Sequence, residues 1–374
     1  MLFKRLRTLE RTHQMPAFAM RNTLVSTLAA TLAAVLVAVS CGFSASTAFS
    51  QAPLSSAATN PAVRENGQSS TTTGAFSWLP DSEGVSLMQN KALVLRYQFV
   101  SESKPIVYPI IGPGGTNMTR DFPMKSADKG GTKDHVHHRS LWMTHGEVNG
   151  IDFWMEGEKA GRIVHDAVVS SDVSQAGAKL ATTANWVTPD NKVLLRESRI
   201  MTVSGDDNTR AIEFEIDLTA GDEKVHFGDT KEGSFGIRVP DSMAVDSKLG
   251  GTILNEHGEH DGDAWGKKSR WVDYSGPVTD PQTATEKVVG ITVLEHPASF
   301  GHPCRWHVRT YGLFAANPFG QHHFIGGEPT AGHTLAAGEA IHFQYKVLLH
   351  AGNANVELIE ANWKQFANQA KTAR

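Results

Sequence analysis

The stretch Ile212-Glu213-Phe214-Glu215-Ile216-Asp217-Leu218 alternates apolar and acidic residues without a break. Successive side chains of a β-strand point to opposite faces of a sheet, so this pattern predicts a strand with one buried and one solvated face. The stretch Ile341-His342-Phe343-Gln344-Tyr345-Lys346-Val347 repeats the alternation. Together the two stretches predict a sheet whose apolar face covers a core.

Shorter segments of similar character run along the rest of the chain. They predict further strands over 92–100, 106–111, 162–173, 179–187, 192–203, 233–239, 270–275 and 288–294. Turn signals such as Gly112-Pro113-Gly114-Gly115 and Pro189-Asp190-Asn191 separate these segments. Because no helical pattern is interleaved, we expect an all-β fold, a large antiparallel β-sandwich.

A helix is predicted at the end of the chain, over 355–371. Val356, Ile359, Trp363 and Phe366 recur there at helical spacing, behind Asn355 as the capping residue. We expect its apolar stripe to pack on the sandwich.

The first fifty residues are predicted to be an export signal, because basic residues precede the apolar run Leu24 to Val39. Cleavage is expected near Ser50, and a lipid anchor on Cys41 is the alternative. Residues 51–75 are small and polar and predict a flexible leader, and 76–374 a single sandwich domain that includes the C-terminal helix. The protein is therefore expected to be periplasmic or secreted, with no membrane span after signal removal.

The charge balance and the cysteines narrow the classes further. Of 35 Lys and Arg and 39 Asp and Glu, five basic and one acidic residue lie in the first fifty positions, which leaves 30 against 38, a net charge of −8. Such a surface does not attract nucleic acid. Removal of Cys41 leaves Cys304 as one thiol, so no internal disulfide is expected and stability must come from a large core.

The block from Asp134 to Trp154 is dense in histidine and is the first candidate site. His138 and His145 are candidate acid/base residues, since imidazole titrates near neutral pH. If the segment is extended, His135 and His137 point to one face and His138 to the other. The alternative is that His135 and His137 bind a metal ion together with His307 as a third ligand, which would make the protein a metal-dependent oxidase or hydrolase. No cofactor is otherwise predicted, although a divalent metal is possible.

The same block carries groups that suit a sugar. Trp142 and Trp154 can stack on a sugar ring, with Arg139, Asn149 and Asp152 as hydrogen-bonding partners. The alternative is structural: the indoles belong to the core, and Asn149-Gly150 forms a type I′ hairpin turn.

A second cluster lies between His296 and His323. On a strand, Arg305, His307 and Arg309 share one face, where two guanidiniums flanking an imidazole would bind a carboxylate or a hydroxyl-rich ligand. Further candidate binding residues are Tyr311, Asn317 and His322. Glu232 is the preferred carboxylate if the chemistry needs a base. Two clusters of the same chemistry predict that both line one cleft.

These motifs carry a resemblance to a known family. Segments 109–113, 119–124, 134–154 and 305–320 resemble the PmoA-like family of exported bacterial proteins. The resemblance covers Val85 to Gly352. The family is named after a methane oxygenase subunit and its reaction is not established, so the resemblance implies an exported protein without implying an activity.

A more distant similarity is to galactose mutarotase-like proteins, and it implies a β-supersandwich. It rests on the turn Leu335-Ala336-Ala337-Gly338-Glu339, which leads into the strand from Ile341. In mutarotases a histidine protonates the ring oxygen and a glutamate takes the anomeric proton. The corresponding stretch here, Gly312 to Asn317, has no glutamate, so the similarity implies a sugar-binding cleft rather than simple epimerase activity.

The sequence thus predicts an exported carbohydrate-active or carbohydrate-binding protein. Its expected partner is a small-molecule or oligosaccharide ligand, a sugar or a sugar acid, and the other possibilities are the metal enzyme and a non-catalytic binding module. No phosphate loop, dinucleotide-binding glycine motif or nucleophile elbow is present in the sequence.

Overall fold

The computed structural model describes residues 75–127, 130–206, 208–329 and 332–369. The predicted export signal, the leader up to residue 74 and Cys41 lie outside the described residues. Within the described part of the chain, no helix is long and apolar enough to cross a membrane.

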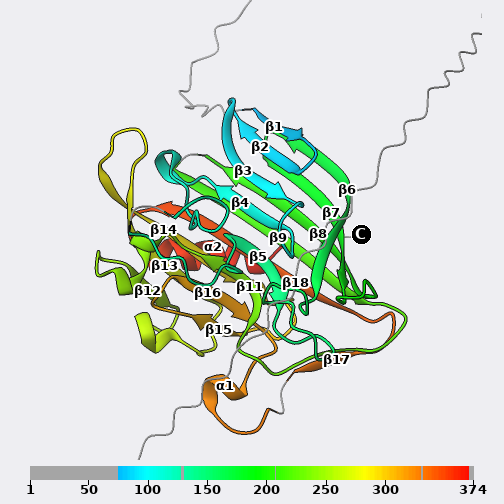
Figure 1. The fold of residues 1–374 in the computed structure, drawn as a ribbon. Helices are drawn as coiled ribbons and strands as arrows, with labels where there is room; N and C mark the ends of the chain where they lie inside the picture. The colour runs from blue at the N-terminus through cyan, green and yellow to red at the C-terminus, as the bar shows by residue number, and fades with distance from the viewer. Residues whose placement is uncertain (1–74, 128–129, 207, 330–331, 370–374) are drawn as a thin grey trace, which may run out of the picture. The chain divides into compact units, whose positions relative to one another are not determined.

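The first large sheet is antiparallel and its strands follow the order β1-β2-β3-β4-β5-β11-β16-β15 (Figure 1). Its strands are β1 (Phe76–Pro80), β2 (Gly84–Gln89), β3 (Ala92–Gln98), β4 (Ile106–Ile110), β5 (Leu141–His145), β11 (Gly233–Arg238), β15 (Arg305–Val308) and β16 (Leu313–Asn317).

The second large sheet is also antiparallel, in the order β12-β13-β14-β18-β9-β8-β7-β6. Its strands are β6 (Arg162–Ser174), β7 (Gly177–Val187), β8 (Val193–Gly205), β9 (Thr209–Ala220), β12 (Thr252–Asn255), β13 (Trp271–Thr279), β14 (Glu286–Glu295) and β18 (Ala340–Ala351).

Smaller elements complete the described chain. A two-stranded sheet pairs β10 (Val225–Phe227) with β17 (His333–Leu335). The helices are the 3-10 turns η1 (Pro113–Gly115), η2 (Asp241–Met243), η3 (Val245–Ser247) and η4 (Asp261–Ala264), and the α-helices α1 (His322–Ile325) and α2 (Val356–Ala367).

The two alternating stretches are neighbours in the second sheet. β9 pairs with β18 so that Phe214 lies opposite Tyr345 and Ile216 opposite Phe343. These four side chains have no exposed surface. Full burial of such a side chain contributes about 1.5–3 kcal/mol, so this register contributes to the stability of the core.

The two sheets face each other across one hydrophobic core. Phe235 of β11, in the first sheet, contacts Phe214 at a ring-centroid distance of 5.1 Å and Tyr345 at 4.6 Å. The prediction of an all-β antiparallel sandwich is therefore confirmed. Every strand predicted by residue range is also present, with ends that differ by a few residues.

The predicted C-terminal helix is confirmed as α2, and Figure 1 shows it next to β14. The Asn355 side chain caps it by accepting a hydrogen bond from the Leu358 main-chain N–H at 3.0 Å. Its residues Ile359 and Phe366 pack on Trp271, Leu294 and Leu348 of the second sheet. The helix thus covers apolar surface on the face turned away from the core.

Candidate ligand site on the outer face of the first sheet

Four aligned residues form a row across the first sheet. Trp142 of β5 pairs with Gly236 of β11, Gly236 with Ala315 of β16, and Ala315 with His307 of β15. Their neighbours along each strand, such as Met143 and Phe235, belong to the core between the sheets. Because side chains alternate along a strand, the row lies on the outer face, which is turned away from the second sheet.

The two middle positions of this row are occupied by the smallest residues, Gly236 and Ala315. A Cβ atom at Gly236 would meet the Trp142 ring at 2.8 Å, so the indole lies directly over the glycine. Trp142 and Ala315 belong to a second, smaller apolar cluster with Trp154 and Tyr311. Trp142, Trp154 and Tyr311 therefore form an aromatic layer over the row, on the outer face of the sheet.

His135, His137 and His138, three of the histidines of the 134–154 block, form a cluster of rings on a loop rather than on a strand. Residues 131–140 have no regular secondary structure, and His135 has a positive φ of 45°. The His138 ring stacks on His135 at 4.7 Å and on Trp142 at 5.4 Å, while His137 meets it edge-on at 4.5 Å. The expectation that His135 and His137 point away from His138 is wrong, because that segment is a loop folded against the aromatic layer.

Tyr311 joins this stack to the second cluster. Its ring is parallel to that of His135 at 5.0 Å, and the Arg238 guanidinium lies 4.8 Å from its centroid. The Arg309 guanidinium lies 5.6 Å from the same ring. The two clusters that the sequence singled out therefore meet at Tyr311.

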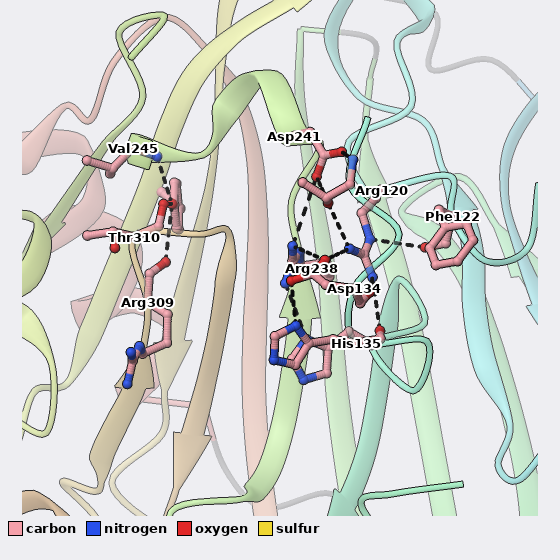
Figure 2. Close-up of polar contacts among 12 residues, drawn as sticks. Arg120, Phe122, Asp134, His135, Arg238, Asp241, Val245, Arg309 and Thr310 are labelled. Atoms are coloured by element: carbon pink, nitrogen blue, oxygen red, sulfur yellow. Dashed lines mark hydrogen bonds and ion pairs between the residues drawn. The ribbon is translucent and has the colours of Figure 1, made fainter. Parts of the chain in front are cut away.

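Two buried arginines hold the loop in place, as Figure 2 shows. Arg120 donates to the Asp134 carboxylate at 2.8 Å and to the main-chain oxygens of Asp134 and His135, both at 3.0 Å. Arg238 donates to the same carboxylate at 3.2 Å and to His138 Nδ1 at 3.4 Å. Burial raises the pKa of Asp134, but Arg238 and the hydrogen bonds from His135 and Arg120 outweigh burial and lower the pKa to about 2.

His307 and Glu232 form the pair of side chains in this site that is best suited to acid/base chemistry. His307 Nδ1 lies 3.6 Å from Glu232 Oε2, and both atoms are buried without a hydrogen-bond partner among the described residues. Burial lowers the pKa of His307 to about 3, whereas burial raises the pKa of Glu232. Both groups are thereby biased toward their uncharged forms.

Asn317 explains why Glu232 is placed beside His307. Its side-chain amide donates to the carbonyls of Thr230 at 2.9 Å and Lys231 at 3.0 Å. Its carbonyl oxygen accepts from the main-chain N–H of Phe319 and Gly320. Asn317 therefore holds the segment before β11 against β16, which is a positioning role rather than the ligand contact that we predicted.

Several predicted site residues lie outside this group. His145 is fully buried among Phe227 and Phe319, with its Nε2 atom 2.8 Å from the Gly228 carbonyl oxygen. Asn149 forms the predicted turn, since Asn149 and Gly150 both have positive φ, and its side chain bonds the β10 segment. His322 lies at the start of α1, 3.2 Å from Asp229.

Other predicted residues support the site from beneath or beside it. Trp142 and Trp154 are buried against each other at 5.3 Å, so neither presents an open face to a sugar. Arg139 is held by Glu156 through two hydrogen bonds of 2.7 and 2.9 Å. Asp152 accepts from the main-chain N–H of Trp154 and Met155 and lines a cavity of about 410 Å³ together with Glu156.

Sequence reasoning missed the residues that anchor the loop. Arg120 lay within a motif of the family resemblance and Asp134 at the start of the first candidate block, but neither was predicted as a site residue, and Arg238 was not predicted as one either. A signal for Arg238 was present, because it occupies an outward position of a strand whose other residues are buried. Trp265, over which Arg309 lies at 5.8 Å, had no such signal.

The hypothesis of a metal site at His135, His137 and His307 is not supported by a cluster of ligands in the described residues. In the ranges covered by the structure, no group of three or more His, Cys, Asp or Glu side chains is arranged to hold a metal ion. His135 and His137 lie edge-on with ring centroids 5.7 Å apart and, like His138, pack among aromatic rings. Cys304 is buried, and burial raises the pKa of its thiol, so it is not a poised nucleophile.

Comparison with solved structures finds low similarity. The galactosidase domain of an alpha-galactosidase–sucrose kinase matches at 10% identity and a TM-score of 0.36, over 74% of this chain and 40% of that chain. A glycoside hydrolase family 97 enzyme in complex with acarbose, from Pseudoalteromonas sp. strain K8, matches at 10% identity and a TM-score of 0.28, over 73% and 34%. The chain thus spans about two fifths or less of these two enzymes.

A galactose mutarotase-like protein from Lactobacillus casei is also similar, at 11% identity and a TM-score of 0.26, over 74% of this chain and 100% of that chain. Likeness at this level does not transfer an activity.

The comparison with protein-family models identifies the family of this chain, which the comparison with solved structures does not. No curated protein matches the chain. Nothing in the comparisons bears on the PmoA-like name, which stays a prediction. A model of a family of unknown function, DUF6807, matches residues 82–364, a range that contains every residue of the site. The chain therefore belongs to the DUF6807 family.

Proposed function

We propose that the outer face of the first sheet binds a carbohydrate, and that His307 and Glu232 transfer a proton to or from it. The observation that carries this proposal is the pair of buried polar atoms, His307 Nδ1 and Glu232 Oε2, 3.6 Å apart and without hydrogen bonds in the described structure. Leaving a polar atom buried and unpaired costs about 1–3 kcal/mol. A sugar hydroxyl that approaches from the side could hydrogen-bond to both atoms at once.

The protonation states suit acid/base work. A pKa of about 3 keeps His307 neutral at physiological pH, and a neutral imidazole offers one donor and one acceptor nitrogen. The raised pKa of Glu232 brings this carboxyl closer to the pH at which it can both take up and release a proton. The glutamate that is missing between Gly312 and Asn317 is thus replaced by one from the neighbouring strand segment.

The surroundings fit a ring-shaped polar ligand. Tyr311 and Trp265 are partly exposed aromatic rings near Arg309, the charge of Glu232 acts on Tyr311, and Asp152 contributes to the electrostatic environment of Glu232. Partly exposed aromatic rings can pack on the C–H face of a sugar, while acidic and basic groups bond its hydroxyls. As part of the same proposal, the protein acts outside the cytoplasm, in keeping with its predicted export signal.

The test is a thermal-shift and calorimetric screen of the protein against neutral monosaccharides, uronic acids and their oligosaccharides. We expect at least one of them to raise the melting temperature and to bind with a measurable Kd. Glu232→Gln and His307→Ala should each weaken binding about tenfold or abolish turnover followed by ¹H NMR of the sugar.

Matched controls are Glu223→Gln and His257→Ala, because Glu223 and His257 are exposed residues. Both controls should bind as the unmodified protein does. If no sugar binds, or if the site variants bind and react like the controls, the proposal is wrong. Binding without any change in the sugar would assign the site to a non-catalytic binding module.

A further inference from the structure

The arginines around the site differ in how their charge is compensated. Arg120 and Arg238 share Asp134, with Asp241 also 4.0 Å from Arg238 (Figure 2). Arg139 is paired with Glu156 at 2.7 Å. Each of these three cations therefore has an anion of the protein as its neighbour.

Arg309 has no such partner. In the described ranges its guanidinium makes no ion pair or hydrogen bond, and it lies 5.8 Å from the ring centroid of Trp265 and 5.6 Å from that of Tyr311. The bond drawn to this residue in Figure 2 ends on its main-chain oxygen, which accepts from Tyr274. Two aromatic rings thus hold the guanidinium in place without neutralising it or using its N–H donors.

The surroundings of Arg309 are locally basic, although the chain as a whole is acidic. Arg305 on the same edge strand donates only to the Gly266 carbonyl, and Lys268 is its strand-bridge neighbour. The carboxylates in this region include Glu232, which lies 3.5 Å from Lys231, and Asp152, whose charge acts on Glu232. This edge of the first sheet therefore has cations in excess.

Arg309 is also close to the proposed reacting pair. It follows His307 by two positions, directly after the end of β15, and its charge acts on both His307 and Glu232. An anion held by the guanidinium would consequently lie beside a sugar hydroxyl bonded to these two side chains.

We infer that the ligand is an acidic sugar and that Arg309 binds its carboxylate. This inference rests on the proposed function and names its substrate class. The planar fork of a guanidinium matches a carboxylate with two parallel hydrogen bonds, and the rings near Arg309 do not use its N–H donors. Arg309 is thus a specificity-determining residue, while His307 and Glu232 act on the sugar ring.

The experiment compares D-glucuronate with D-glucose, and D-galacturonate with D-galactose, by isothermal titration at fixed ionic strength. We expect at least one uronate to bind about tenfold or more tightly than its neutral counterpart. Arg309→Ala should remove this preference and leave the affinity for the neutral sugar within about twofold, and Arg309→Lys should restore it in part, because lysine keeps the charge but loses the fork.

Arg196→Ala is the matched control, since Arg196 is an exposed arginine of β8 in the other sheet. It should keep the preference for the uronate. D-glucose 6-phosphate is a further arm, and tighter binding of this ligand than of either uronate would overturn the carboxylate assignment.

The outcomes separate this inference from the proposed function. Neutral sugars that bind as tightly as the uronates overturn the role of Arg309 while the carbohydrate site stands. A uronate preference that survives in Arg309→Ala, with a melting temperature like that of the unmodified protein, overturns it too. If neither neutral nor acidic sugars bind, both proposals fall.

Discussion

At the scale of single residues, the site depends on the lack of a side chain at Gly236. The Trp142 indole occupies the space above this glycine, and His138 and Trp154 pack on the indole. No role for Gly236 was predicted from the sequence, because the partner that needs the space lies almost a hundred residues earlier in the chain. The need appears only once β5 and β11 are paired.

Gly236→Ala is expected to destabilise the protein by about 1–3 kcal/mol, because the new methyl group must displace the Trp142 ring in a close-packed layer. The measurement is the free energy of unfolding from urea denaturation. Gly262→Ala is the matched control, since a Cβ at Gly262 meets no atom within 4 Å, and it should be nearly neutral. Equal stability of both variants would contradict this packing.

At the scale of elements, the edge strand β15 behaves as its sequence predicts. Trp306 and Val308 face the core, and Arg305 and His307 lie on the opposite face, while Arg309 comes directly after the end of the strand. The period of two required no tertiary information. The 131–140 loop is the opposite case, since its shape depends on ion pairs with Arg120 and Arg238, which come from distant positions.

Helix α2 offers a test at the same scale. Ile359→Ala should lower the free energy of unfolding by about 2–5 kcal/mol, because its side chain is 3% exposed and packs on the second sheet. Its neighbour Leu358 is 48% exposed, so Leu358→Ala should cost well under about 1 kcal/mol. Chemical denaturation of the two variants measures the difference, and similar losses would show that the helix does not dock through Ile359.

At the scale of the whole molecule, the fold buries histidines in their neutral form. Burial lowers the pKa of His137 and of His145 to about 4, that of His307 to about 3, and that of His138 well below its usual value. His350 behaves in the opposite way: burial lowers its pKa, but Asp273 at 2.7 Å outweighs burial and raises it. The buried neutral histidines and His350 therefore make the stability depend on pH in opposite directions.

The free energy of unfolding should fall as the pH decreases below about 6.5. In that range the histidines of the unfolded chain bind protons, whereas the buried histidines of the folded protein stay neutral. The contribution of His350 is present below about pH 6.5 and is lost as the pH rises through its higher folded pKa. Urea denaturation from about pH 8 to pH 4 measures both effects. A constant free energy between about pH 6.5 and pH 4.5 would contradict neutral burial of these rings.

The sequence by itself determined the fold class, the strands, the capped C-terminal helix and the outward face of β15, because hydrophobic periodicity and capping are local properties of a chain. It also identified both histidine- and arginine-rich clusters and expected them to meet. Only the tertiary structure decided which members meet. It placed His145 in the core and Trp142 beneath the histidines, it set Glu232 against His307, and among the described residues it left Arg309 without an ion pair. These outcomes depend on strand order and on contacts between distant segments, which no local pattern specifies.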